Sequence, residues 1–200
     1  MKKLIGDKKM DALNHGKTTR RIVDELMSGK SPEILKVAAL YHDIERDYPN
    51  KVNTKNCRAE DYLVRKMLHS MNSVKTFIKH FANNYDENMV EDITFLISRH
   101  EIGGDKDENG ELIYKTDETG KYNLNELAEI LLWADKLTFF EIEIEEYSKR
   151  GPEKLRNKII FSLENLPEKI RKKIFNKNYE PEINKIIHDI KITKYTISQK

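Results

Sequence analysis

The most constraining feature of this sequence is an apolar segment that ends in a histidine and an aspartate. Ser31-Pro32-Glu33 is typical of a helix start, because a hydroxyl can cap the first turn, proline is tolerated there and an acid favours the positive helix end. The side chains from Ile34 to Tyr41 are apolar on nearly every side of a helix. Such a helix is expected to be buried. The pattern therefore predicts a central helix that carries His42 and Asp43 into the interior.

A buried imidazole next to a buried carboxylate needs a partner, since an unpaired polar group in the interior costs free energy. A divalent first-row metal would satisfy both groups, and such a metal can make water a nucleophile. Neighbouring residues point about 100° apart around a helix axis. His42 and Asp43 therefore cannot enclose an ion by themselves, and other helices have to supply the remaining ligands.

Two further residues are candidates for those ligands. His15 lies upstream and Asp135 downstream, each on its own predicted helical segment. Two imidazoles and two carboxylates leave positions open on a six-coordinate metal. Open positions are what a hydrolytic site requires for water and for a substrate oxygen.

Periodicity predicts helices along most of the chain and hence an all-α fold. Between Gly103 and Asn123 the sequence is polar and contains glycines, which predicts a loop or a small hairpin. The predicted helices span about 9–27, 34–41, 58–68, 74–83, 87–98, 124–147, 154–163, 168–175 and 182–192.

The charge of the chain is unevenly distributed. Residues 149–200 carry 14 Lys/Arg and 6 Asp/Glu, a net charge of +8, whereas the rest of the chain carries −6. This basic segment is either a solvated helical face or a surface for phosphates or nucleic acid. Its aromatic side chains are scattered, and a nucleic-acid stacking platform needs neighbouring rings. Nucleic acid is therefore the less favoured partner.

The composition indicates a soluble globular protein. Charged residues make up 35% and hydrophobic residues 38%, with 8 Gly and 5 Pro. An apolar run of about 18 residues, which a membrane span requires, is missing, and the N-terminus does not resemble a secretory signal. Cys57 is the single cysteine, which fits a reducing compartment. We expect a cytoplasmic protein without membrane contact; self-association is left open.

At this point the sequence resembles a known family. The order His15, His42-Asp43, Asp135 is similar to that of the HD-domain metal-dependent phosphohydrolases, over roughly residues 10–147. Four segments carry the resemblance: Asn14-His15, the small apolar approach Ala38 to Ile44, Arg99-His100 before the polar loop, and Ala134-Asp135-Lys136-Leu137.

The resemblance implies an HD-domain helical bundle over residues 1–150, with the polar insertion at about 103–123. A basic helical extension, residues 151–200, would pack on it. One divalent metal ion would be held by His15, His42, Asp43 and Asp135, with Mn, Fe, Co, Ni, Zn and Mg all open. The implied reaction is hydrolysis of a phosphate ester of a nucleotide or a related small metabolite.

The residues after the His-Asp pair are candidates for the chemistry. Glu45 and Asp47 are candidate general bases, although related enzymes place their acids at different offsets. Arg46 and Lys136 are candidate phosphate contacts, because a cation balances the charge of a phosphoryl group. Glu45 and Arg46 could equally form a surface ion pair.

The remaining histidines bear on the number of metals. His100 would contact the substrate or a metal-bound water, or would merely cap its helix. His69 and His80 lie in amphipathic patterns and are interpreted as surface or core residues. Some family members hold a second metal through a histidine shortly after the pair, where this chain has Lys55-Asn56-Cys57-Arg58. We therefore predict one metal rather than two.

Three functions follow from these observations. The first is a metal-dependent phosphohydrolase. The second is a non-catalytic metal-binding or ligand-binding HD module. The third is an HD protein that associates with nucleic acid through its basic C-terminal segment.

Overall fold

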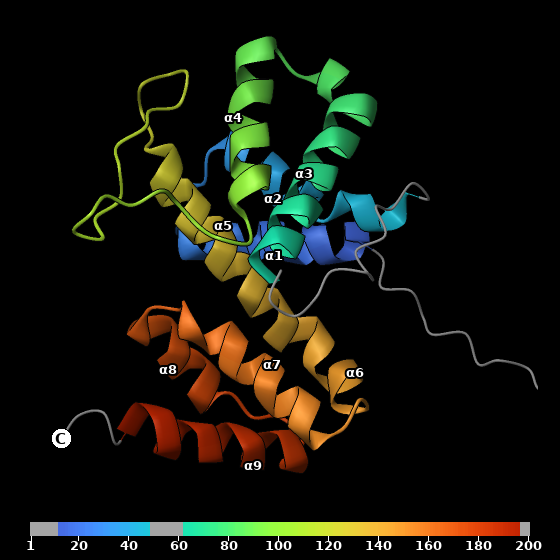
Figure 1. Ribbon diagram of the computed structural model, residues 1–200, viewed down its shortest axis with the longest axis vertical. Coiled ribbons are helices and arrows are strands. Elements are labelled where there is room, and N and C mark those ends of the chain that lie inside the picture. The colour runs from blue at the N-terminus through green and yellow to red at the C-terminus, as the bar shows by residue number, and fades with distance from the viewer. Residues whose placement is uncertain (1–11, 49–61, 197–200) are drawn as a thin grey trace, which may run out of the picture. The chain divides into compact units, whose positions relative to one another are not determined.

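The computed structural model describes residues 12–48 and 62–196, and every regular element in these ranges is helical (Figure 1). The predicted all-α fold is confirmed. The chain divides into two compact units between Asp135 and Lys136, earlier than the boundary predicted near residue 150. The predicted helix starts near Lys9 and Arg58, and the segment around Cys57, lie outside the described residues.

The first unit contains the segment that the sequence singled out. The long helix α5 begins in this unit and crosses into the second. The elements are α1 (Ala12–Leu26), α2 (Glu33–Tyr41), the 3-10 helix η1 (Ile44–Asp47), α3 (Tyr62–His80), η4 (Ala82–Asn84), α4 (Glu87–Arg99) and α5 (Leu124–Thr138).

Helix α2 is the buried helix that the sequence predicts. Leu35, Ala38 and Ala39 are fully buried, and α2 packs against both α1 and α4. Its predicted start is confirmed, but the predicted cap is not. The Ser31 hydroxyl donates to the Asp24 carboxylate on α1 instead of capping the first turn. This bond ties the connection between α1 and α2 to the end of α1.

Helices α1 and α2 approach each other closely at Gly16. A Cβ atom at this position would collide with the carbonyl oxygen and carbonyl carbon of Leu40. Only glycine lets the two backbones come this near. The contact matters for function because His15 precedes Gly16 and His42 follows Leu40 by two residues.

Helix α3 differs from the prediction. The sequence suggested two helices, over 58–68 and 74–83, but one continuous helix runs from Tyr62 to His80. One side of it, with Ser70, Ser73 and Phe77, is buried. Polar residues on this side weaken the apolar periodicity, which is why the pattern looked interrupted. Helix α3 packs against α4.

The segment from Gly103 to Asn123 is a loop with two tight turns and no strand. Two isolated antiparallel bridges, Lys106 to Leu112 and Thr116 to Asn123, hold it together. The turns contain Gly110 and Gly120, whose positive φ angles of 83° and 68° favour glycine. The insertion is therefore a structured loop rather than a hairpin of regular strands.

The second unit is built from short helices. The helix predicted over 124–147 is interrupted, since α5 ends at Thr138 and a π-helical turn follows. Leu155, Ile159, Leu163, Ile183 and Ile190 form its fully buried interior. The elements after α5 are η5 (Phe139–Glu143), α6 (Ile144–Ser148), α7 (Pro152–Glu164), α8 (Glu168–Asn176), α9 (Pro181–Ile190) and η6 (Lys191–Thr196).

Among the described helices, none combines the length and the apolar character needed to cross a membrane.

The close contact at Gly16 predicts an unusual response to a small substitution. At an exposed helix position, Gly→Ala would favour folding by about 1 kcal/mol. Here we expect Gly16→Ala to lower the free energy of unfolding by about 1–3 kcal/mol or more, because the methyl group overpacks the contact with α2. Urea denaturation followed by circular dichroism measures the change. Lys17→Ala, at an exposed position of α1, is the control, and a Gly16→Ala variant as stable as this control would contradict the contact.

Candidate metal centre

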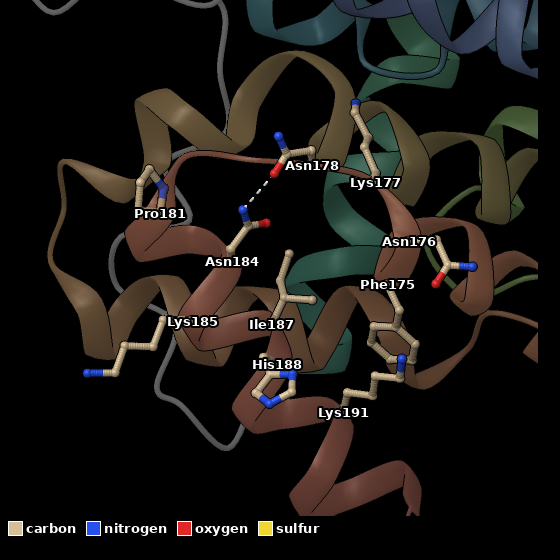
Figure 2. A pocket seen from close by; sticks show the side chains of 10 residues that line it. All are labelled: Phe175, Asn176, Lys177, Asn178, Pro181, Asn184, Lys185, Ile187, His188 and Lys191. Atoms are coloured by element: carbon tan, nitrogen blue, oxygen red, sulfur yellow. Dashed lines mark hydrogen bonds between the residues drawn. The ribbon is translucent and has the colours of Figure 1, made fainter.

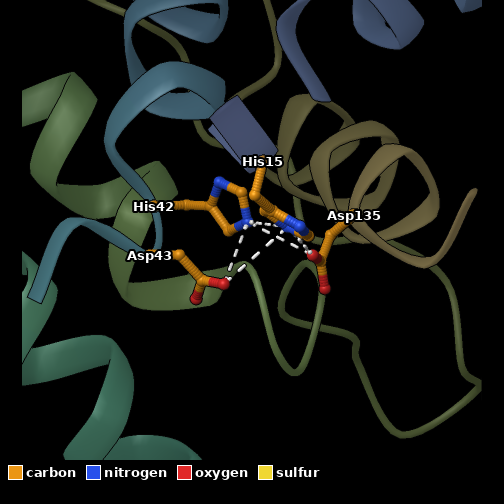
Figure 3. A group of neighbouring side chains, drawn as sticks. All are labelled: His15, His42, Asp43 and Asp135. Carbon is orange, nitrogen blue, oxygen red and sulfur yellow. Dashed lines mark hydrogen bonds and ion pairs between the residues drawn. The ribbon is translucent and has the colours of Figure 1, made fainter. Parts of the chain in front are cut away.

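Four side chains from separate parts of the first unit converge on one point (Figure 3). His15 comes from α1, His42 and Asp43 from the junction of α2 and η1, and Asp135 from α5. One nitrogen or oxygen atom from each of the four lies within 4.8 Å of those from the other three. The structure therefore brings together all four residues that the sequence marked as metal ligands.

The shortest distances run between the two imidazoles and Asp135. His15 Nε2 lies 2.9 Å and His42 Nε2 3.2 Å from Asp135 Oδ1, and the two Nε2 atoms are 3.2 Å apart. Asp43 Oδ2 is 3.7 Å from His15 Nε2 and 3.9 Å from His42 Nε2. Ligands about 2.1 Å from an ion lie roughly 3–4 Å from one another. These spacings therefore fit a common divalent cation.

The backbone orients one of these imidazoles. His42 Nδ1–H donates to the carbonyl oxygen of Ala39 at 2.9 Å. In the neutral ring this bond leaves the lone pair on Nε2, which faces the cluster. A histidine that binds a metal through one ring nitrogen usually donates a hydrogen bond from the other, as His42 does here.

The surroundings of both carboxylates of the cluster favour the ionised form. Burial by itself raises the pKa of Asp43, but Arg46 and the neighbouring imidazoles outweigh it and hold that pKa well below its usual range. Burial likewise raises the pKa of Asp135, while its interactions with the adjacent His15 and His42 rings lower it further than burial raises it. Ionised carboxylates are the form that a metal ion binds.

Asp43 also faces a second group of histidines. Its Oδ1 lies 2.6 Å from His69 Nε2 on α3 and 3.6 Å from His100 Nε2 at the end of α4. His100 Nδ1–H donates to the carbonyl of Ile97 at 2.7 Å. His100 Nε2 is buried and has no hydrogen-bond partner among the described residues. His100 Nε2, His69 Nε2 and Asp43 Oδ1 therefore offer a second set of atoms that could hold a cation.

The convergence of these elements agrees with a comparison of the whole sequence. A model of the family described as HD domain matches residues 12–139, which is more than half of the chain and includes every residue of the cluster. The chain belongs to the HD-domain family. Searches of the curated proteins and of the solved structures gave no match. HD domains bind divalent metals, and the His/Asp cluster is compatible with that property.

His69, interpreted from the sequence as a surface or core residue, lies partly buried beside the candidate centre. It contacts two acids of this HD domain, Asp43 through Nε2 and Glu45 through Nδ1, the latter at 3.0 Å. Burial lowers the pKa of His69, but the charge of Asp43 more than offsets this and raises it to about 10. The sequence contained a signal for polar contacts on this helix, because Ser70 and Ser73 lie on the side of α3 that is buried.

Glu45 and Arg46 both contact the centre. Glu45 Oε1 accepts from His69, while Arg46 Nη1 lies 2.7 Å from Asp43 Oδ2. The two side chains therefore pair with site residues rather than with each other. About a third of the Arg46 side chain is exposed, so that its guanidinium lies at the edge of the centre.

Asp47 is placed differently from its neighbours. Its two carboxylate oxygens accept the backbone N–H groups of Ala12 and Leu13 at 3.2 and 3.3 Å. These N–H groups belong to the first turn of α1, where they lack helical partners. Asp47 thus caps α1 and is not part of either histidine–carboxylate group.

Lys136 belongs to the second compact unit, although it follows Asp135 directly. It is buried, and its ammonium group donates to the carbonyl oxygen of Phe161 at 3.0 Å. The same group lies 4.3 Å from the centre of the Phe161 ring. These contacts engage Lys136 within its unit, and its phosphate contact stays a prediction.

The position of Asp47 predicts that its replacement lowers the stability of the fold but leaves metal binding unchanged. Asp47→Ala removes the cap of α1, and we expect the free energy of unfolding to fall by about 1 kcal/mol. Asp47→Asn keeps an oxygen acceptor and should lose less. Thermal unfolding measures the first effect, and elemental analysis should find the same metal content in both variants. Loss of metal from a folded Asp47→Ala protein would instead assign this carboxylate to the metal centre.

Proposed function

We propose that this protein is a metal-dependent phosphohydrolase that cleaves a phosphate ester of a nucleotide or a related small metabolite. The observation that carries the proposal is the convergence of His15, His42, Asp43 and Asp135 within 4.8 Å. Family membership supports it, because HD domains are generally hydrolases.

In this proposal the two imidazoles and two carboxylates hold one divalent ion. When bound, such an ion polarises a phosphoryl oxygen and lowers the pKa of water. The protein fixes the ligands beforehand, since Ala39 orients His42 and Gly16 allows α1 to bring His15 beside it. Asp43, His69 and His100 form a second ligand group on the other oxygen of Asp43. A metal content above one ion per chain would place an ion there.

Arg46 is the proposed phosphate contact. Its guanidinium lies on Asp43 at the partly exposed edge of the centre. A planar guanidinium forms paired hydrogen bonds with phosphate oxygens, and its charge balances the negative charge that develops during transfer. His100 is the second proposed contact, because its Nε2 points towards Asp43 without a partner among the described residues.

Glu45 is the proposed proton acceptor. Asp47 is the weaker candidate for this role, because its carboxylate is engaged at the start of α1. Glu45 Oε1 lies 3.0 Å from His69 Nδ1, and His69 Nε2 reaches Asp43. The hydrogen bond from His69 holds the Glu45 carboxylate in place at Oε1, and its second oxygen, Oε2, is the proposed site of proton uptake.

Replacing Asp43 tests the metal centre. We expect Asp43→Ala to lose both its metal and its phosphate release, because this carboxylate faces both histidine groups. Helicity should be largely retained. Elemental analysis measures the first effect. Phosphate release measures the second with nucleoside mono-, di- and triphosphates, and chromatography of the products measures it with alarmones and cyclic nucleotides. Asp105→Ala is the control, since this carboxylate also pairs with an arginine, Arg99, but lies in the loop.

Two results would contradict the proposal in different ways. Full metal occupancy in a folded Asp43→Ala protein would contradict the ligand set. Bound metal in the native protein without turnover on the panel would favour a non-catalytic binding module.

Replacing Glu45 tests the proton acceptor. We expect Glu45→Gln to lower the rate of phosphate release by roughly 10²–10⁴-fold, the range attributed to a general base. The metal content should stay that of the native protein, because Glu45 is not in the group of four. Single-turnover kinetics with the best substrate of the panel provides the measurement. An unchanged rate would remove Glu45 from the proton transfer.

A further inference from the structure

The second unit contains a hollow that the proposed reaction does not use (Figure 2). It has a volume of about 530 Å³ and lies between the end of α8, the segment 177–180 and α9. Sites for small molecules typically measure about 300–1,000 Å³. The residues that line the hollow follow residue 174, and the match to the HD domain ends at residue 139.

The lining of the hollow is cationic. Lys177, Lys185, His188 and Lys191 are among its lining residues, and no carboxylate lines it. The Lys177 ammonium donates to the carbonyl oxygen of Phe140. Lys185, His188 and Lys191 follow one another at intervals of three residues on the helical run of α9 and η6, which places them along one side of it. Exposed lysines at the rim of a concave surface without acids concentrate anions there.

The hollow also has an apolar wall. Phe175 is half-buried and Ile187 is buried, and both line the hollow. Figure 2 shows Lys191 beside the Phe175 ring, and its Nζ lies 5.7 Å from the ring centre. A ring with a lysine at its edge can hold a flat aromatic group while the ammonium contacts an attached anion.

One side of the hollow is fixed by hydrogen bonds. Asn184 Nδ2 donates to Asn178 Oδ1 at 3.0 Å and to the carbonyl of Tyr179 at 2.7 Å, while its Oδ1 accepts from the Tyr179 N–H at 3.0 Å. These three bonds hold the turn that precedes α9 (Figure 2). The hollow therefore exists before a ligand binds, which lowers the ordering cost of binding.

We propose that this hollow is a second ligand site, which binds a free phosphorylated small molecule with a flat ring, of the nucleotide class. The phosphates contact Lys185 and Lys191, and the ring lies on the wall of Phe175 and Ile187. The site is independent of the metal centre and does not depend on the proposed hydrolysis.

The experiment uses the full chain with Asp43→Ala and without divalent metal, so that the probe is not cleaved. ATP is titrated in by isothermal titration calorimetry. We expect saturable binding of one ATP per chain, weakened at least tenfold by the double substitution Lys185→Glu/Lys191→Glu. The control is Lys154→Glu/Lys169→Glu, which changes the net charge equally at exposed positions outside the hollow. It should weaken ATP binding less than threefold.

Further titrations identify which chemical groups of the ligand the hollow binds. Tripolyphosphate should bind at least fivefold more weakly than ATP, because it lacks a ring. Equal affinities would overturn the ring contact. Absence of ATP binding, or equal weakening by both double substitutions, would overturn the site. Tighter binding of a single-stranded oligonucleotide than of ATP would assign the basic surface to nucleic acid instead.

Separate control experiments test the folding of the variants and the proposed reaction. With Asp43 intact, Lys185→Glu/Lys191→Glu should keep the helicity and the metal content of the native protein. A failure of the hydrolysis proposal leaves the ATP titration unaffected, because the titration uses a chain that lacks Asp43. A failure of the titration leaves the metal content and the phosphate release of the native protein unaffected.

Discussion

The buried carboxylate of Asp43 is the group around which the side chains of the candidate centre are arranged. An ionised carboxylate in the interior is costly unless several partners surround it. Arg46 and the first pair of imidazoles face Oδ2, whereas His69 and His100 face Oδ1. These partners come from α1, α2, η1, α3 and α4. Side chains from these elements thus meet at one negative charge, and the place where they meet is the candidate metal centre.

Backbone contacts let these helices come close enough. Gly16 allows α1 to touch the last turn of α2 at Leu40, and this contact sets the spacing between His15 and His42. Asp47 then caps α1 from the 3-10 helix that follows Asp43. The chain segment after the His-Asp pair is thereby anchored to the helix that supplies the first histidine. The contact at Gly16 thus serves both stability and the geometry of the site, whereas the Asp47 cap serves the stability of α1.

Local patterns were sufficient for part of this picture. The buried helix over 34–41 and the polar loop over 103–123 follow from residue types within a few turns of chain, and both are present. The division of α3 into two helices was wrong because its buried side carries serines instead of an unbroken apolar row. The prediction that Ser31 caps α2 was also wrong, because the Ser31 hydroxyl donates to Asp24 on α1 instead. In both cases a contact from another helix decided what the local pattern could not.

The sequence by itself determined the fold class, the family and the four residues that converge, because helical periodicity and the order of His15, His42-Asp43 and Asp135 are written along the chain. Only the tertiary structure decided the roles of their neighbours. It placed His69 on Asp43 and Asp47 at the start of α1, across 26 and 35 residues of sequence. The physical reason is that a polar side chain pairs with the group that helix packing brings beside it. The hydrophobic periodicity of a sequence does not indicate which group that will be.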